Sequence, residues 1–216
     1  MQHSTVSQVF FFLAVVVSFG CGSVLADPSD WAEGTKEHND GANREHYNQA
    51  ASLRWAHFMG DWCDAEGIEQ GEAAYAIAEV SDTDTLKPVR WDVTTLANEW
   101  DEGTHPNQGM FLRVVEGAGR TAFASRESTD HSQHPKLELT GENGTAILDA
   151  IADTFLTKST FRCQGQSPKL RVSAEAENLL VRFDFEQASD IGTITNATLL
   201  LHSPEQFDSA SIGVFR

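Results

Sequence analysis

The sequence predicts an all-β fold of the sandwich type. Short apolar runs recur along the chain, and the clearest of them alternates apolar and polar side chains as a half-buried strand does. Gly, Asp and Asn turn signals separate these runs. The sequence has no βαβ rhythm and no nucleotide-binding glycine motif. Short strands at this spacing, with turns between them, favour two packed antiparallel sheets.

The first 26 residues predict a secretory signal peptide rather than part of the fold. Val9–Phe19 is an apolar run of the length of a signal h-region, and Ser23–Ala26 places small residues just before Asp27. The segment contains no Lys or Arg, which departs from the usual pattern. A membrane anchor and a lipid attached to Cys21 are the alternatives. We expect cleavage before Asp27 and export of the remaining chain.

Residues 27–142 are expected to form five short strands and one helical turn. Thr94–Trp100 predicts the helix, because Leu96 and Trp100 lie four residues apart on one helical face. The strands are expected at Ala73–Val80, Val89–Val93, Met110–Val115, Thr121–Ala124 and Lys136–Leu139.

Residues 146–216 are expected to contain three further strands. In Leu179–Phe185 the apolar residues point to one side, whereas Arg182 and Asp184 point to the other. A second strand is expected at Thr193–Leu201, and a third begins at Ile212. Residues 140–146 contain turn-forming residues, and Thr140–Thr145 has no apolar side chain, so this segment is expected to join the two parts of the chain.

The charge of the chain excludes several partners. Lys and Arg total 15 against 32 Asp and Glu, which gives a net charge of −17. Residues 27–142 carry most of this excess, with 23 acidic and 9 basic side chains. Nucleic acid and anionic membranes both require a basic surface, so neither is expected as a partner. No apolar run outside the N-terminus has the length of a membrane span, so no membrane insertion is expected after signal cleavage.

Several segments resemble the DNRLRE domain, which is also called carbohydrate-binding module family 96 or disaggregatase-related. In residues 27–142 the similar segments are Asp30–Thr35, Trp62 with Gly67, Trp91–Thr94, Trp100, Asn107–Leu112, Phe123–Glu127 and Pro135–Leu139. In residues 146–216 they are Ala152–Leu156, Arg182–Phe185 and Ile194–Leu201. The resemblance implies a secreted or surface-attached jelly-roll β-sandwich that binds polysaccharide.

The order of the two parts departs from that family. Residues 27–142 resemble the C-terminal half of the domain, and residues 146–216 resemble its N-terminal half. One interpretation is a circular permutant, a single domain in which residues 146–216 complete the sandwich, or a strand-swapped homodimer with the same contacts. The other is a pair of truncated modules, although half a sandwich buries little surface and exposes strand edges.

Sugar binding requires flat aromatic rings and planar polar groups, and the sequence offers candidates for both. Trp31, Trp55 and Trp62 lie in the loop-rich stretch 28–72 and are the candidate stacking rings, with core packing as the alternative. Trp91 and Trp100 follow strand and helix patterns and are expected in the core. The candidate polar groups, which could equally form cross-strand ion pairs, are Arg126, Glu127, Arg182 and Asp184.

A structural calcium ion is a possible cofactor, and no other cofactor is predicted. Jelly-roll modules often carry calcium, and carboxylate oxygens suit this ion. Asp153 and the acidic loop Asp61–Glu72 are the candidate ligands. In an oxidising compartment, Cys63 and Cys163 are expected either to form a disulfide or to remain two buried free thiols.

The function predicted from these observations is non-catalytic polysaccharide binding outside the cell or at its surface. The alternatives are a structural or adhesive sandwich that binds no sugar and a polysaccharide lyase. A lyase would need a base such as Tyr47 or Tyr75, with His38, His46 and His57 nearby. The acidic charge favours a neutral glycan, whereas the resemblance extends to binders of acidic polysaccharide.

Overall fold

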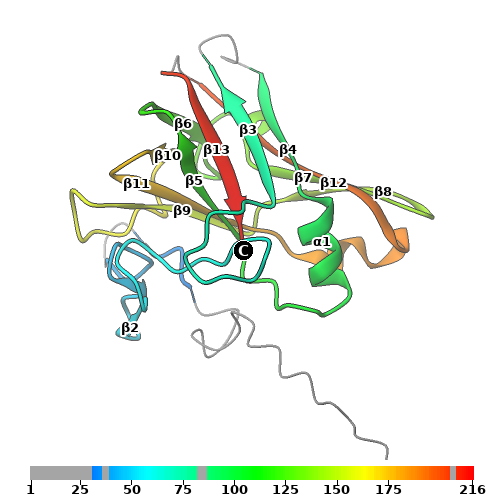
Figure 1. Ribbon diagram of the computed structural model, residues 1–216, viewed down its shortest axis with the longest axis horizontal. Coiled ribbons are helices and arrows are strands. Elements are labelled where there is room, and N and C mark those ends of the chain that lie inside the picture. Colours follow the sequence, from blue (N-terminus) through cyan, green and yellow to red (C-terminus); the bar gives the residue numbers. More distant parts are fainter. Residues whose placement is uncertain (1–30, 36–38, 82–86, 205–207) are drawn as a thin grey trace, which may run out of the picture.

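Two antiparallel sheets pack face to face in the computed structural model, which describes residues 31–35, 39–81, 87–204 and 208–216 (Figure 1). The seven-stranded sheet runs β3 (Ala76–Val80), β13 (Ala210–Phe215), β5 (Met110–Glu116), β11 (Glu177–Arg182), β10 (Lys169–Ser173), β6 (Arg120–Ala124), with β9 (Ala152–Thr157) also paired to β11. The four-stranded sheet runs β4 (Pro88–Asp92), β12 (Ile194–His202), β7 (Lys136–Gly141), β8 (Gly144–Asp149). The other described elements are β1 (His46–Asn48), β2 (Leu53–Arg54), α1 (Thr94–Asp101) and the 3-10 helices η2 (His131–Gln133) and η3 (Phe185–Ile191).

The predicted all-β sandwich is confirmed by this architecture. Each strand expected from the alternation patterns is present, and so is the helix, with bounds displaced by a few residues. The pattern analysis did not identify β1, β2, β8, β9 or β10, although Ala152–Leu156 of β9 was among the segments that resemble the family. The expected signal peptide, residues 1–26, lies outside the described residues. None of the helices in the described part of the chain is long and apolar enough to cross a membrane.

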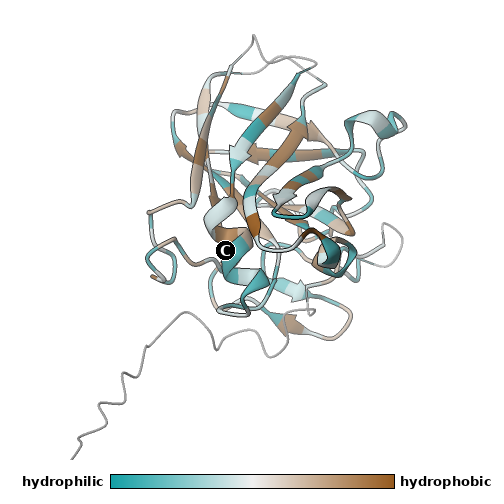
Figure 2. Cartoon of the chain, turned by 90° about the vertical axis from the view of Figure 1, so that its right-hand side faces the viewer, coloured by the Kyte–Doolittle hydropathy of each residue, from teal (hydrophilic) through white to brown (hydrophobic). Residues whose placement is uncertain are grey.

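The main core lies between the two sheets. Leu179, Val181 and Phe183 point into it as the alternation predicted, and all three are buried. Trp91 and Trp100 also belong to this core, as expected. Figure 2 shows the hydrophobic residues concentrated along the strands and the hydrophilic ones along the connections. Burial of this apolar surface is the main favourable contribution to folding.

A second apolar cluster covers the outer face of the seven-stranded sheet. Phe111, Leu180 and Phe215 alternate with residues of the main core and therefore point outward. The segment formed by residues 31–35 and 39–62 places aromatic and apolar side chains on them, among them Trp31 and Trp55. In Figure 1 this segment is drawn in blue and cyan beside β9 and β11. The outer faces of β5, β11 and β13 are consequently covered over much of their length.

Strands from both parts of the chain alternate within each sheet. β5, from residues 27–142, lies between β13 and β11, which come from residues 146–216. β12 in turn lies between β4 and β7. Residues 140–146, expected to join the parts, form a tight hairpin in which Gly141 pairs with Gly144. Each sheet therefore requires strands from both sides of this turn.

The structure contradicts both alternatives for Cys63 and Cys163, a disulfide between them and two free thiols. Cys163 is a buried free thiol that donates a hydrogen bond to the Thr35 carbonyl at 3.3 Å, and the Cys163 amide donates to Asn39 Oδ1 at 2.7 Å. Cys63 is disulfide-bonded, but its backbone pairs with that of Arg216. The two cysteines are held by different parts of the fold, so their sulfur atoms are not brought together.

Candidate functional site

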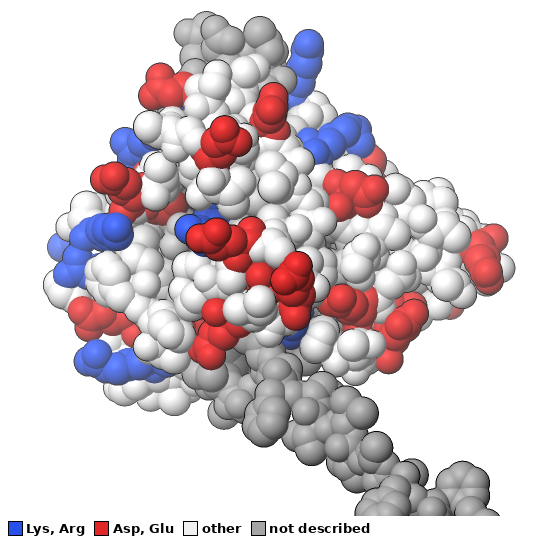
Figure 3. All heavy atoms as spheres, in the orientation of Figure 1, with Lys and Arg blue, Asp and Glu red and all other residues white. Residues whose placement is uncertain are grey.

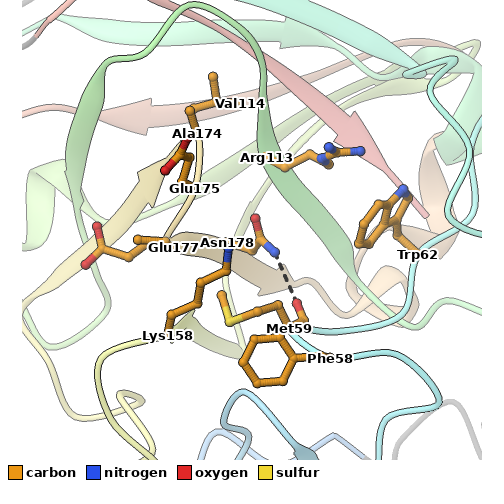
Figure 4. A pocket seen from close by; sticks show the side chains of 11 residues that line it. Phe58, Met59, Trp62, Arg113, Val114, Lys158, Ala174, Glu175, Glu177 and Asn178 are labelled. Carbon is orange, nitrogen blue, oxygen red and sulfur yellow. Dashed lines mark hydrogen bonds between the residues drawn. The ribbon is translucent and has the colours of Figure 1, made fainter.

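A pocket of about 230 Å³ lies between the loop that follows β2 and the seven-stranded sheet (Figure 4). The loop contributes Phe58 and Trp62, and β5 contributes Arg113. The remaining chemically important side chains are Lys158 after β9, Glu175 in the β10–β11 turn and Asn178 on β11. We call this site the Trp62 pocket.

The aromatic side of the pocket combines one fixed ring and one exposed ring. The Trp62 indole stacks on Phe111, with 5.1 Å between ring centroids and 23° between planes. Trp62 Nε1 donates a hydrogen bond to the Gly71 carbonyl at 3.0 Å, which fixes the orientation of the ring. Phe58 is 56% exposed, so its ring is open to solvent. Exposed aromatic surface at a concave site is typical of a ligand-binding surface.

The polar side of the pocket is supplied by the sheet. The Arg113 guanidinium lies 4.6 Å from the centre of the Trp62 ring, and burial lowers its pKa while the charge of Glu72 opposes this shift. Asn178 Nδ2 donates a hydrogen bond to the Met59 carbonyl at 3.1 Å, which ties the loop to β11 (Figure 4). The alternation rule places Arg113 on the outer face of β5, beside the outward-facing Phe111.

The pocket is less acidic than the protein as a whole. Glu177 at its margin is engaged by Arg120 through two hydrogen bonds of 2.8 Å. Arg113 and Lys158 have no ion-pair partner among the described residues. Figure 3 shows acidic and basic side chains interspersed over one face of the protein. The cationic side chains of the pocket are therefore available to a ligand.

Two of the three tryptophans expected to stack on a ligand are buried instead. Trp31 is 2% exposed and donates from Nε1 to the Gln108 carbonyl at 2.7 Å. Trp55 is buried as well and donates to the Asn43 carbonyl at 2.7 Å. The expectation that these rings are exposed is wrong, because the outer face of the sheet is itself apolar and the two indoles cover it. Trp62 is the predicted stacking residue that the structure places in a pocket.

Arg182 and Asp184, predicted as a polar binding pair, have separate surroundings. The Arg182 guanidinium lies 4.9 Å from the centre of the Trp31 ring. Asp184 begins η3, where its Oδ1 accepts a hydrogen bond from the Glu186 amide at 3.0 Å. Asp184 therefore acts as a helix cap, which is a common use of this residue type.

Three predicted site residues lie close together: Arg126, Glu127 and Asp153. Glu33 lies beside them and was not among the predicted site residues. Arg126 Nη1 donates to Glu33 Oε2 at 2.7 Å, and the Arg126 amide donates to Asp153 Oδ2 at 2.8 Å. The Asp153 amide donates to Glu33 Oε1 at 3.0 Å. Glu33, Glu127 and Asp153 each offer one carboxylate oxygen within 4.8 Å of the others, and we call these three residues the carboxylate cluster. These residues come from three of the segments that carry the family resemblance: Asp30–Thr35, Phe123–Glu127 and Ala152–Leu156.

Two carboxyl groups of the carboxylate cluster, those of Asp153 and Glu127, have raised pKa values. Burial raises the pKa of Asp153 to about 8, and the nearby charges of Glu127 and Glu33 act in the same direction, whereas hydrogen bonding and charge from Arg126 oppose it. Burial also raises the pKa of Glu127, with a contribution from Glu33. A carboxyl group with these neighbours disfavours its own charged form.

The acidic loop Asp61–Glu72, the other candidate calcium ligand, uses its carboxylates to hold its own backbone. Asp64 accepts hydrogen bonds from the amides of Glu66, Ile68 and Ala73 at 3.0, 2.8 and 3.2 Å. Asp61 likewise accepts from the amides of Ala56 and His57, both at 2.8 Å. In the described part of the chain, neither residue belongs to a group of three possible metal ligands.

Replacing Asp64 by alanine is expected to destabilise the protein by about 2–3 kcal/mol, because three backbone donors lose an ionised acceptor. Burial acts to raise the pKa of Asp64, but the hydrogen bonds together outweigh it and lower this pKa. Their stabilisation is therefore present at neutral pH and is lost as the pH falls below about 4. Urea denaturation of wild type and Asp64→Ala at pH 7 and pH 3 measures both effects. An equal difference between the two proteins at both pH values would contradict this account.

The residues considered for a lyase are engaged in other interactions. The Tyr75 hydroxyl donates to Glu99 Oε2 at 2.7 Å, and its pKa is raised to about 12, chiefly by burial and by Glu99. His57 Nδ1 lies 3.0 Å from Asp61 Oδ1. Tyr47 and His46 are buried, and His38 lies outside the described residues. A phenol with a pKa of about 12 is a poor general base at neutral pH.

A family model described as the disaggregatase related repeat domain matches residues 35–139. The matched range contains β1–β6, the first part of β7 and, within the Trp62 pocket, Phe58, Trp62 and Arg113. It supports the resemblance for this part of the chain and does not extend to residues 146–216. No curated protein and no solved structure matches the chain.

Proposed function

We propose that this protein is a non-catalytic polysaccharide-binding module that acts outside the cell or at its surface, with the Trp62 pocket as its sugar-binding site. The observation that carries the proposal is the meeting of aromatic rings with cationic and amide side chains in one pocket. The family match over residues 35–139 agrees with a carbohydrate-related module. We also propose that residues 27–142 and 146–216 correspond to the two halves of the family's domain in swapped order, as in a circular permutant.

The chemistry of the pocket suits a pyranose ring. One face of such a ring presents C–H groups, which pack on an exposed aromatic side chain such as Phe58. The hydroxyl groups need hydrogen-bond donors and acceptors, which Arg113, Asn178 and Glu175 offer in the lining of the pocket. Because Trp62 and the Asn178 amide are held by hydrogen bonds, the pocket loses little freedom on binding.

The size of the pocket favours part of a polymer over an enclosed small molecule. Pockets for drug-sized ligands are about 300–1,000 Å³ and bury most of the ligand surface. The Trp62 pocket, at about 230 Å³, is smaller than this range. A polysaccharide would therefore place one or two units in the pocket while its neighbouring units extend over the surface.

Local charge and net charge make different demands on the ligand. The net charge of −17 repels an anionic polymer at long range, an effect that salt weakens. Arg113 and Lys158 attract a carboxylate at short range. We therefore expect a neutral glycan to bind with little dependence on salt, and a uronate polymer to bind only through these two cationic residues.

Phe58→Ala is expected to weaken binding to the preferred polysaccharide by roughly tenfold, because the stacking surface is lost. Arg113→Ala is expected to weaken it by at least as much, since a hydrogen bond from a charged donor is removed. Affinity gel electrophoresis against a neutral glucan, a mannan and a uronate polymer measures both effects. Ile147→Ala and Lys136→Ala, on the four-stranded sheet, are matched controls that should bind as wild type does.

Three results would count against this proposal. If no polysaccharide retards the wild-type protein, the structural or adhesive alternative gains support. If glycans bind but Phe58→Ala and Arg113→Ala leave the retardation unchanged, the binding site lies elsewhere. If incubation with a uronate polymer releases unsaturated products that absorb in the ultraviolet, the protein is a lyase and not a binding module.

A further inference from the structure

The carboxylate cluster has the features of a cation site. Asp153 is completely buried, and Glu33 and Glu127 are partly buried beside it. Three acidic groups within 4.8 Å of one another repel each other strongly in surroundings that water screens poorly. Native proteins retain buried charges only where a partner compensates them.

Two oxygen atoms of the cluster lack a partner in the described structure. Asp153 Oδ2 accepts from the Arg126 amide, whereas Asp153 Oδ1 is buried without a hydrogen bond to any described residue. Glu127 Oε2 is likewise buried without a partner among the described residues. A buried carboxylate oxygen without a donor is costly, so such an atom is expected to meet a ligand.

The acidic groups of the site outnumber the basic ones. Three carboxylates face two cationic side chains: Arg126, which is bonded to Glu33, and Arg182, whose positive charge also acts on Glu33. When all three carboxylates are ionised, negative charge is in excess, and a bound cation neutralises it.

We propose that Glu33, Glu127 and Asp153 bind a divalent cation and that this ion is Ca²⁺. The ligand set consists of carboxylate oxygens, which suit a hard cation rather than a metal that prefers sulfur or imidazole. Ca²⁺–oxygen distances of about 2.3–2.6 Å allow one ion to contact oxygens as far as roughly 5 Å apart, and the three carboxylates lie within that span. Water and backbone carbonyl groups would complete the shell, as Ca²⁺ tolerates irregular coordination.

The bound ion would link three parts of the fold. Glu33 belongs to the segment that covers the seven-stranded sheet, Glu127 follows β6, and Asp153 lies near the start of β9. The Trp62 pocket lies towards the opposite end of β9, where Lys158 is found. The cation is therefore expected to stabilise the covering segment without contacting a ligand in the pocket.

The test compares the thermal unfolding of chelator-treated protein with and without CaCl₂, in the absence of any glycan. We expect Ca²⁺ at about 100 times its Kd to raise the Tm by roughly 5 °C or more, because the ion binds only the folded state. Asp153→Asn should abolish the shift, since the amide has nearly the same shape but no charge. Glu127→Gln, a second variant, should weaken the response at least tenfold in Ca²⁺ concentration.

The matched control is Asp149→Asn, which removes an exposed carboxylate on β8 that pairs with Lys136 and should leave the shift unchanged. The proposal is overturned if Ca²⁺ leaves the wild-type Tm unchanged, or if Asp153→Asn and Glu127→Gln respond to Ca²⁺ as wild type does. A larger shift with Mg²⁺ than with Ca²⁺ would overturn the choice of ion. None of these results depends on sugar binding, so the two proposals fail separately.

Discussion

Cutting the chain between Glu142 and Asn143 is expected to leave two fragments that stay associated and that do not fold alone. The cut falls in the two-residue turn of the β7–β8 hairpin. On one side of it lie β4, β5 and β7, and on the other lie their neighbours β12, β11 and β13. A sheet that loses alternate strands has neither its hydrogen-bond partners nor a closed core.

The experiment introduces a specific protease site at this turn and cleaves the folded protein. Size-exclusion chromatography should show one species before and after cleavage, and the two fragments should separate only in denaturant. Expressed separately, each fragment should lack a cooperative unfolding transition, and mixing them should restore one. A cooperative transition in either isolated fragment would show instead that the chain consists of two independent modules.

Trp91→Ala is expected to cause the largest loss of stability among single core substitutions that leave both proposed sites intact. Trp91 lies on β4 of the four-stranded sheet and is almost completely buried. Its Nε1 donates a hydrogen bond to the Ile212 carbonyl on β13 of the opposite sheet at 2.9 Å. Its ring packs edge-on against Phe123 on β6, with 5.9 Å between centroids. One side chain thus joins both sheets and both parts of the chain.

Removing this side chain should cost about 3–5 kcal/mol, which is a large share of the roughly 5–15 kcal/mol that stabilises a typical protein. Trp91→Phe keeps an aromatic ring but loses the donor, so it should cost about 1–2 kcal/mol. Urea denaturation followed by circular dichroism measures both values. Ile147→Ala, which shortens an exposed side chain, serves as the control and should change the free energy of unfolding little. A cost of Trp91→Ala below that of Trp91→Phe would contradict the role given to the ring.

The alternation of apolar and polar residues was sufficient to predict the strands that have one buried and one exposed face. Val89 and Trp91 on β4 alternate with exposed neighbours, so the strand was predicted nearly to its bounds. The Leu179–Phe185 pattern likewise identified the residues that point into the main core. Neither pattern could show that the outer face of β5 and β11 is covered as well, because Phe111 and Leu180 meet residues distant in the sequence.

The Trp62 pocket was found only in part from the sequence. Trp62 was predicted, whereas Phe58, Arg113, Lys158 and Asn178 were not. One local signal was present: Arg113 interrupts an otherwise apolar run of β5, and a charged residue in such a run indicates a place where the sheet face is open. Lys158 and Asn178 have no comparable signal, since β9 and β11 bring them together through pairing.

The carboxylate cluster, too, was predicted only in part from the sequence. Asp153 was a candidate ligand from its residue type and position, and Arg126 and Glu127 were candidates for polar contacts. Glu33 lies 120 positions before Asp153, and the two are joined by a hydrogen bond that forms only when the covering segment lies on the sheet. Residue type therefore indicated which side chains could act as ligands or polar contacts, and the fold determined which of them lie together.

The sequence by itself determined the all-β class, most of the strands, the strong acidity and the family resemblance. These properties are local or additive, since alternation depends on neighbouring residues and net charge is a sum over the chain. Only the tertiary structure decided that Trp31 and Trp55 are buried, that Cys163 is a free thiol and that Glu33 joins Asp153. Each of these outcomes depends on which segments come together when apolar surface is removed from water. The free energy gained by this burial depends on the whole chain rather than on any one segment.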